Sequence, residues 1–253
     1  MFCLSGINCV ITGGTSGIGL AVARRFAAAR ANVAIVGRRA TSELAKSAGA
    51  KTHIVADCST ESGVQSAMQQ AHEQLGSLDV IINNAGLENT GPLLAEATRE
   101  ELERVFDLNT FGVFYGIKYG QGYLRDGGAI INTASIAGLI GIPGYGQYCA
   151  SKAAVISLTQ TAAVELGVRN IRVNAVCPGS VFTDMLPPDH PEVNLVKKLC
   201  PLGRIGTTDE LVGIYHFLAA PESAYLTGQA IAVDGGVVAG VSLGTLDAIT
   251  RAV

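Results

Sequence analysis

The sequence predicts an α/β fold, a doubly wound parallel sheet of seven strands that is flanked by helices and forms a single domain over residues 1–253. Short apolar runs alternate along the chain with longer helical stretches, which is the pattern of strand–helix–strand units. Most runs are apolar at successive positions, as expected of strands that helices cover on both faces. Seven runs show this pattern: Cys9–Thr12, Val33–Gly37, Thr52–Ala56, Asp79–Asn83, Ala129–Ala134, Ile171–Val176 and Ile231–Asp234.

The composition is that of a globular chain with a large core, because 48% of the residues are apolar and 15% are charged. The net charge of −3, with scattered lysines and arginines, predicts no nucleic-acid partner. The sequence shows no signal peptide and no apolar run long enough to cross a bilayer, so we expect a cytoplasmic protein with no membrane partner. The six cysteines form no C-x-x-C pair, which predicts buried thiols and no metal site.

The first predicted strand leads into a glycine-rich turn, T-G-G-T-S-G-I-G at residues 12–19, and then into a helix predicted over Ile18–Ala29. Glycines in such a turn let the backbone approach a pyrophosphate closely, and the helix start directs its N–H groups toward the phosphates. The alternative is a turn that binds nothing, which its position after the first strand disfavours. The sequence therefore predicts a dinucleotide site with contacts from Gly13, Thr15, Ser16, Gly17, Ile18 and Gly19.

The loop after the second strand, in V-A-I-V-G-R-R, is predicted to meet the adenosine end of the dinucleotide. An acidic residue here would bond the ribose 2′-OH, but the chain has Gly37 followed by Arg38 and Arg39. Two cations suit a 2′-phosphate, so NADP(H) is the preferred cofactor, with NAD(H) as the alternative. The alternative is that one or both arginines are solvated surface charges and bind no phosphate.

Polar and small residues follow the third and fourth strands, at the carboxyl edge where open α/β sheets bind ligands. Asp57 is placed to accept a hydrogen bond from the adenine amino group, with Cys58 beside it, or else to cap the following helix. The fourth strand ends in N-N-A-G, and Asn84, Ala85 and Gly86 are predicted to contact the cofactor.

A tyrosine and a lysine lie one helical turn apart in Y-C-A-S-K, at Tyr148 and Lys152. A phenol near its free pKa of about 10 is a poor acid–base catalyst at neutral pH, and an adjacent ammonium lowers that pKa. Ser135 follows the fifth strand in A-S-I-A-G, so it is expected at the same edge of the sheet. Together the three residues predict a site that transfers a proton to or from a substrate oxygen.

Six features occur in one order and spacing from about residue 6 to about residue 240: T-G-G-T-S-G-I-G, N-N-A-G, Asn109 in F-D-L-N-T-F-G-V-F, Ser135, Y-C-A-S-K, and P-G-S-V-F-T at 178–183. In these features the chain resembles the short-chain dehydrogenase/reductase family. The resemblance implies a Rossmann-like fold, a nicotinamide cofactor and a homotetramer. It also implies a catalytic set of Asn109, Ser135, Tyr148 and Lys152. The further cofactor contacts that it implies are Tyr148, Lys152, Pro178, Gly179, Val181 and Thr183, the last two at the nicotinamide carboxamide.

For such a family member, reduction transfers a hydride to a carbonyl carbon while Tyr148 donates a proton to the oxygen and Ser135 hydrogen-bonds that oxygen. Lys152 would also bind the nicotinamide ribose. Asn109 would anchor a water that passes protons to Lys152, and the alternative is an asparagine that only bonds helix backbone. In reverse, the same site oxidises a secondary alcohol.

The residues around the predicted site indicate the substrate class. An irregular stretch, Pro178–Gly206, carries five of the eight prolines, and residues 183–206 are predicted to form a substrate lid. The residues expected to line the pocket are mainly apolar and include no lysine or arginine, which favours a small hydrophobic ketone or secondary alcohol. They are Leu87, Glu88, Ile136, Ala137, Leu139–Tyr145 and Phe182–Leu186. Glu88 is expected either at a solvent-facing rim or as an acceptor for a substrate hydroxyl. The predicted substrate contacts are Glu88, Ser135, Ala137, Tyr145, Tyr148 and Met185.

Two other functions compete with that of a small-carbonyl oxidoreductase. A 3-oxoacyl-[acyl-carrier-protein] reductase is also similar in sequence, but docking an acidic carrier needs a cationic surface, and Glu88 lies near the predicted entrance. The other is a non-catalytic dinucleotide-binding sensor, which would not need the proton donor that Tyr148 provides.

Overall fold

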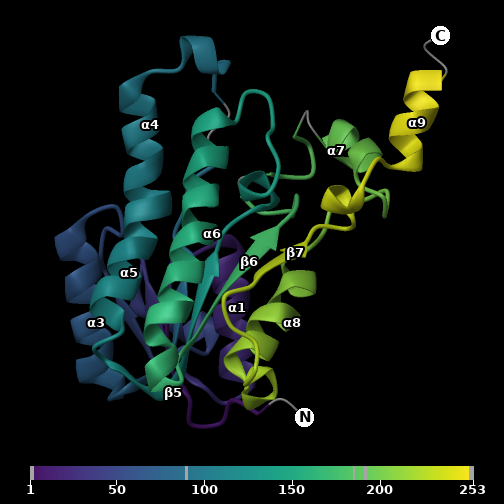
Figure 1. The fold of residues 1–253 in the computed structure, drawn as a ribbon. Coiled ribbons are helices and arrows are strands. Elements are labelled where there is room, and N and C mark those ends of the chain that lie inside the picture. The colour runs from purple at the N-terminus through teal and green to yellow at the C-terminus, as the bar shows by residue number, and fades with distance from the viewer. Residues whose placement is uncertain (1–2, 89–90, 185, 191–192, 251–253) are drawn as a thin grey trace.

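The computed structural model describes residues 3–88, 91–184, 186–190 and 193–250, and within them seven strands form one parallel sheet (Figure 1). The strand order is β3-β2-β1-β4-β5-β6-β7, so the chain winds outward in two directions from β1 and β4. This is the doubly wound, Rossmann-like architecture that the sequence predicts, and that prediction is confirmed. The strands are β1 (Asn8–Thr12), β2 (Asn32–Val36), β3 (Thr52–Ile54), β4 (Leu78–Asn83), β5 (Leu124–Thr133), β6 (Arg172–Pro178) and β7 (Ala230–Val233).

Each predicted run contains a strand, although several strand ends differ from the prediction. β3 ends at Ile54, before the predicted end at Ala56. β5 begins at Leu124 rather than Ala129, because Leu124 pairs with Leu78 before an irregularity in the register. β1 and β4 are buried at every position, as expected of central strands that carry helices on both faces.

Helices cover both faces of the sheet (Figure 1). On one face α1 and α8 pack against each other, and Val22 and Phe26, one turn apart on α1, lie in an apolar cluster with Ile11 of β1. On the other face α3, α5 and α6 enclose a second cluster that includes Met68 and Ile81. No helix in the described ranges is long and apolar enough to cross a membrane. The α-helices are α1 (Gly17–Ala28), α2 (Ser42–Ala48), α3 (Glu61–Leu75), α4 (Arg99–Phe106), α5 (Gly112–Gly120), α6 (Gly146–Leu166), α7 (Val193–Leu199), α8 (Thr208–Ala219) and α9 (Leu243–Thr250).

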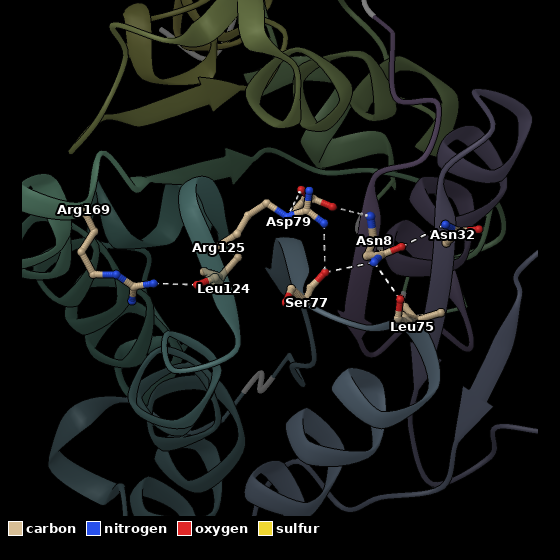
Figure 2. Close-up of polar contacts among 8 residues, drawn as sticks. All are labelled: Asn8, Asn32, Leu75, Ser77, Asp79, Leu124, Arg125 and Arg169. Atoms are coloured by element: carbon tan, nitrogen blue, oxygen red, sulfur yellow. Dashed lines mark hydrogen bonds and ion pairs between the residues drawn. The ribbon is translucent and has the colours of Figure 1, made fainter.

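The amino ends of the central strands are joined by buried polar contacts (Figure 2). The Asp79 carboxylate accepts the Asn8 backbone N–H at 2.8 Å and pairs with Arg125 Nε at 2.8 Å. The Asn8 side chain donates to the Leu75 carbonyl at 2.8 Å and accepts from Asn32 at 2.9 Å. These bonds connect β1, β2, β4 and β5 at the edge opposite the carboxyl ends, where the candidate site lies.

A π-helical turn, η2 (Asp107–Phe111), lies between α4 and α5. A π-helical turn contains more residues than an α-helical turn and is found frequently at functional sites. It brings Asn109, which is fully buried, toward the inner side of this helical stretch. The sequence predicts the importance of Asn109 but not the π-helical geometry that presents it.

The predicted lid is closed at its base, because Val181 forms an isolated parallel bridge with Gly206 and the Phe182 N–H donates to the Gly206 carbonyl at 3.0 Å. The lid is not irregular throughout, as Val193–Leu199 form α7. Prolines 187, 188 and 201 on either side of this short helix explain why the composition indicates a loop. The Ser242 hydroxyl donates to the Lys198 carbonyl, which attaches the start of α9 to the end of α7.

Candidate active site

The glycine-rich turn has no room for side chains at Gly13 and Gly19. A Cβ on Gly13 would lie 2.7 Å from Ala85 Cα, and one on Gly19 would lie 2.3 Å from the Gly13 carbonyl oxygen. In the described chain Ser16, the N-cap of α1, makes no side-chain capping bond, and the first turn of α1 contains no acidic residue. The backbone N–H groups of Gly17 and Ile18, at the start of α1, can therefore donate hydrogen bonds to a phosphate.

The carboxyl end of β2 lies against this turn. A Cβ on Gly37 would approach the Thr15 side chain to 3.0 Å, and Arg39 Nη2 donates to Ser16 Oγ at 3.5 Å. Gly37 and Arg39 thus lie beside the glycine-rich turn. The long 3.5 Å contact leaves the exposed guanidinium only weakly held.

Asp57 and Cys58 lie at the same end of the site. Hydrogen bonds from the Ser59 backbone and hydroxyl, with a smaller contribution from the Arg38 charge, hold the pKa of Asp57 below its usual value. Asp57 does not cap α3, because the side chain of Thr60 does so; the helix-cap alternative is therefore wrong. Burial raises the pKa of the Cys58 thiol to about 12, and this thiol contacts the Gly13 backbone.

Asn84 joins the glycine-rich turn to the end of β5. Its side-chain amide donates to the Thr12 and Gly13 carbonyls at 3.3 Å each, and its carbonyl oxygen accepts from Thr133 Oγ1 at 3.2 Å. The backbone N–H groups of Asn84 and Ala85 both donate to Thr12 Oγ1, at 3.0 and 3.2 Å. N-N-A-G therefore fixes the position of the turn relative to the fourth and fifth strands.

Asn109 holds the segment that follows N-N-A-G. Its Oδ1 accepts the Leu87 N–H at 2.8 Å and its Nδ2 donates to the Leu87 carbonyl at 2.9 Å. The same Nδ2 lies 3.2 Å from Ser151 Oγ. Leu87 and Ser151 lie outside the helical stretch that carries Asn109, so the alternative of a purely helix-bonding asparagine is wrong. A Cβ on Gly86 would lie 3.2 Å from Asn109 Oδ1 and 3.3 Å from Lys152 Nζ, so a side chain there would crowd both groups.

Ser135 and Tyr148 meet at the carboxyl end of β5. The Ser135 hydroxyl accepts the Ala137 N–H at 3.1 Å and hydrogen-bonds the Tyr148 phenol. Burial raises the pKa of Tyr148 to about 12, the bond with Ser135 lowers it, and the negative charge of Glu88 raises it further. The Tyr145 ring packs edge-on against the Tyr148 ring at 6.4 Å between centroids.

The surroundings of Lys152 bear on the pKa that the sequence predicts for Tyr148. Its ammonium donates to the Thr133 carbonyl at 2.9 Å and lies 5.7 Å from the centroid of the Tyr148 ring. Burial lowers the pKa of Lys152 itself to about 8. The pKa of Tyr148 is raised overall rather than lowered as expected, because desolvation of the phenol outweighs the influences that lower it.

The segment after β6 brings further predicted residues to the glycine-rich turn. Pro178 ends β6, and a Cβ on Gly179 would lie 2.7 Å from Asp234 Cα. Val181 is buried at the base of the lid, and Thr183 Cγ2 would lie 3.4 Å from a Cβ on Gly17. A cavity of about 530 Å³ is lined by residues of α1 and α8 and by Phe182, Thr183 and Asp184.

The structure locates some, but not all, of the predicted substrate residues. Ala137 is buried beside Ser135, and Glu88 is exposed. Met185 lies outside the described residues. In the described part of the chain no cluster of three or more His, Cys, Asp or Glu side chains is arranged to hold a metal ion.

Two residues of the site are missed by the sequence reasoning. Thr133 receives the Lys152 ammonium through its carbonyl, and Ser151 accepts from Asn109 while donating to the Tyr148 carbonyl at 2.8 Å. Each had a signal, since Thr133 ends the strand that leads to Ser135 and Ser151 is part of Y-C-A-S-K.

Comparisons with known proteins agree with this arrangement. Residues 13–238 match the sequence model of the family described as enoyl-(acyl carrier protein) reductase. The chain is 38% identical to general stress protein 39 of Bacillus subtilis, over 92% of this chain and 85% of that protein. It is 37% identical to the 3-oxoacyl-[acyl-carrier-protein] reductase FabG of Thermotoga maritima, over 93% of this chain and 99% of that protein.

Solved structures of other proteins are also similar to this chain. A blue fluorescent protein from a metagenomic library, in complex with NADPH, has a TM-score of 0.87 at 36% identity over 92% of this chain and 98% of its own. A short-chain dehydrogenase from Burkholderia cenocepacia, in complex with NADP, has a TM-score of 0.87 at 33% identity over 93% of this chain and 99% of its own. The chain therefore belongs to the short-chain dehydrogenase/reductase family and is an oxidoreductase.

Proposed function

We propose that this oxidoreductase uses a nicotinamide dinucleotide, with NADP(H) preferred, to interconvert a small hydrophobic ketone and the corresponding secondary alcohol. The observation that carries the proposal is that the Tyr148 ring lies beside Ser135 and 5.7 Å from the Lys152 ammonium, while Lys152 and Asn109 both border Gly86. A serine that positions an oxygen beside a protonated phenol is suited to proton transfer at a carbonyl.

The residues of the glycine-rich turn fit a dinucleotide. Gly13 and Gly19 leave no room for side chains, and the start of α1 offers backbone donors to a pyrophosphate. Thr183 lies close enough to Gly17 to take part in the same cradle. The remaining predicted contacts, including Val181 at the nicotinamide, are part of this proposal.

The preference for NADP(H) rests on the end of β2. Gly37 offers no carboxylate to compete for the ribose 2′-OH, and Arg38 and Arg39 supply two cations to a 2′-phosphate. The similar structures that contain NADPH or NADP support this choice.

In the proposed reaction Tyr148 donates its phenol proton to the carbonyl oxygen of the substrate. The raised pKa of about 12 keeps this proton in place at neutral pH. Ser135 hydrogen-bonds the same oxygen, where negative charge develops. Lys152 would bind the nicotinamide ribose, and Asn109 would anchor a water that passes protons to Lys152. When bound, the cofactor supplies or accepts the hydride.

The substrate class follows from the surroundings of Tyr148. Ala137, which is buried, and the Tyr145 ring beside Tyr148 would give a substrate pocket an apolar wall, and residues 183–206 would act as its lid. Glu88 raises the pKa of Tyr148 through its charge, so it lies near enough to disfavour an anionic substrate. The homotetramer implied by the family resemblance stays a prediction, which analytical ultracentrifugation tests.

A second candidate is a 3-oxoacyl-[acyl-carrier-protein] reductase. The observation in its favour is the 37% identity to such an enzyme from Thermotoga maritima. An acetoacetyl thioester of pantetheine separates the two, because a carrier-protein reductase reduces it and a hydrophobic ketone reductase does so poorly.

The test is a fluorescence titration with NADPH and NADH, followed by turnover on a panel of hydrophobic ketones. We expect tighter NADPH binding and turnover that Tyr148→Phe abolishes while dinucleotide binding is retained. Turnover that survives Tyr148→Phe contradicts the assigned proton donor. Dinucleotide binding without turnover on any ketone, alcohol or thioester favours the non-catalytic sensor.

A further inference from the structure

Tyr215 is a fully buried tyrosine of α8 that no part of the proposed reaction uses. Its hydroxyl lies 2.8 Å from Thr133 Oγ1, at the carboxyl end of β5. Burial raises the pKa of Tyr215 well above its usual value, and the bond to Thr133 only partly opposes this. The phenol therefore keeps its proton and has a hydrogen to donate.

The direction of the hydrogen bonds around Thr133 follows from counting donors. Asn84 Nδ2 donates to the Thr12 and Gly13 carbonyls, so the Asn84 oxygen that faces Thr133 acts as an acceptor. Thr133 has one hydroxyl hydrogen, which it gives to Asn84. Tyr215 must then be the donor to Thr133 Oγ1. A one-way chain runs from Tyr215 through Thr133 and Asn84 to the glycine-rich turn.

The hydrogen-bond chain from Tyr215 ends at a tightly packed part of the glycine-rich turn. A Cβ on Gly13 would lie 2.9 Å from Asn84 Nδ2, and one on Gly19 would lie 2.5 Å from it. The Asn84 amide thus fills the space that both glycines leave, so a change in its orientation moves the turn. Thr133, in the middle of this hydrogen-bond chain, has a second role, because its carbonyl accepts a hydrogen bond from the Lys152 ammonium at 2.9 Å.

We propose that Tyr215 is a positioning residue, which orients Thr133 and Asn84 so that the glycine-rich turn is held ready for the dinucleotide. The inference rests on the proposed function, since it assigns the turn to the cofactor. It goes further by including a residue of α8 that lies 82 positions from Thr133 in the sequence.

The experiment compares Tyr215→Phe, Thr133→Val and Thr133→Ser with the unchanged protein. Tyr123→Phe is the matched control, because Tyr123 is a partly buried tyrosine that stacks on His72. For each variant the Kd for NADPH, the melting temperature and the separate KM values for cofactor and ketone are measured. Loss of one buried hydrogen bond is expected to weaken NADPH binding about fivefold in Tyr215→Phe and at least as much in Thr133→Val.

Thr133→Ser keeps the bridging hydroxyl and is expected to bind NADPH almost as the unchanged protein does. The KM for ketone is expected to change little in all four variants, which separates positioning of the turn from general damage. An unchanged Kd in Tyr215→Phe overturns the proposal, as does a lowered melting temperature with unchanged Kd. If the wild-type protein binds neither NADPH nor NADH, the proposed function itself is overturned, and this inference is overturned with it.

Discussion

The Lys152 ammonium donates to the Thr133 backbone carbonyl at 2.9 Å. Its nitrogen lies 5.7 Å from the centroid of the Tyr148 ring, while the phenol hydrogen-bonds Ser135. The two titrating residues are therefore neighbours whose pKa values move in opposite directions on burial: Lys152 falls to about 8 and Tyr148 rises to about 12. Each shift favours the neutral side chain.

The stability of the protein is expected to depend on pH through Lys152. The unfolded lysine has a pKa of about 10.4, so between pH 8 and that value the unfolded state binds more protons than the folded state. The contribution of Lys152 is therefore fully favourable above this window and is lost as pH falls through about 8. Urea unfolding at several pH values should show the wild type gaining stability relative to Lys152→Met between about pH 8 and about pH 10. A constant difference between the two proteins contradicts the shift.

The two directions of the reaction are expected to differ in pH dependence. Carbonyl reduction needs the protonated phenol of Tyr148, which the raised pKa of about 12 preserves across the neutral range. Alcohol oxidation needs the phenolate as base, so its rate should climb through the alkaline range. Initial rates in both directions between pH 6 and 10, at saturating cofactor, check this. An oxidation rate that is flat over that range would mean that cofactor binding has already lowered the phenol pKa.

Cofactor preference is expected to change when the cations after β2 are removed. Loss of the charge-assisted bonds to a 2′-phosphate should weaken NADPH binding by about tenfold or more in Arg38→Leu/Arg39→Leu, with NADH binding nearly unchanged. Arg99→Leu is the control, because Arg99 is exposed on α4 and paired with Glu103. Adding Gly37→Asp to Arg38→Leu should shift preference toward NADH, although the new Cβ displaces the Thr15 side chain. Equal loss of both dinucleotides would show that the arginines support the fold rather than the phosphate.

The amino edge of the sheet offers a stability test that is separate from the site. In Asp79→Ala the buried Asn8 N–H loses its acceptor, which should reduce the free energy of unfolding by about 2 kcal/mol. Arg125→Ala removes a half-exposed partner of the same carboxylate and should cost about 1 kcal/mol or less. Denaturant unfolding gives both values, and dinucleotide binding should stay normal in each variant. The opposite ranking would make Arg125 the more important partner.

The sequence predicts the parts of this structure that depend on local pattern. Apolar runs mark the seven strands, and the turn at residues 12–19 marks the start of α1, because burial on both faces and tight backbone approach restrict residue type. It does not predict that Thr133 is shared by Lys152, Asn84 and Tyr215, since those partners come from different elements. Nor does it predict the pKa of Tyr148, which depends on how fully the folded chain excludes water from the phenol.

The length of the helical stretch from α4 to α5 matters as much as its composition. The π-helical turn at Asp107–Phe111 accommodates a residue more than a regular α-helix would, and Asn109 lies within it. Deleting Leu108 would let the stretch become a continuous α-helix and would rotate Asn109 by about a quarter of a turn. We expect a well-folded helix whose asparagine no longer reaches the Leu87 backbone, with activity as low as in Asn109→Ala. In this part of the chain the residue count, and not only the residue type, is under functional constraint.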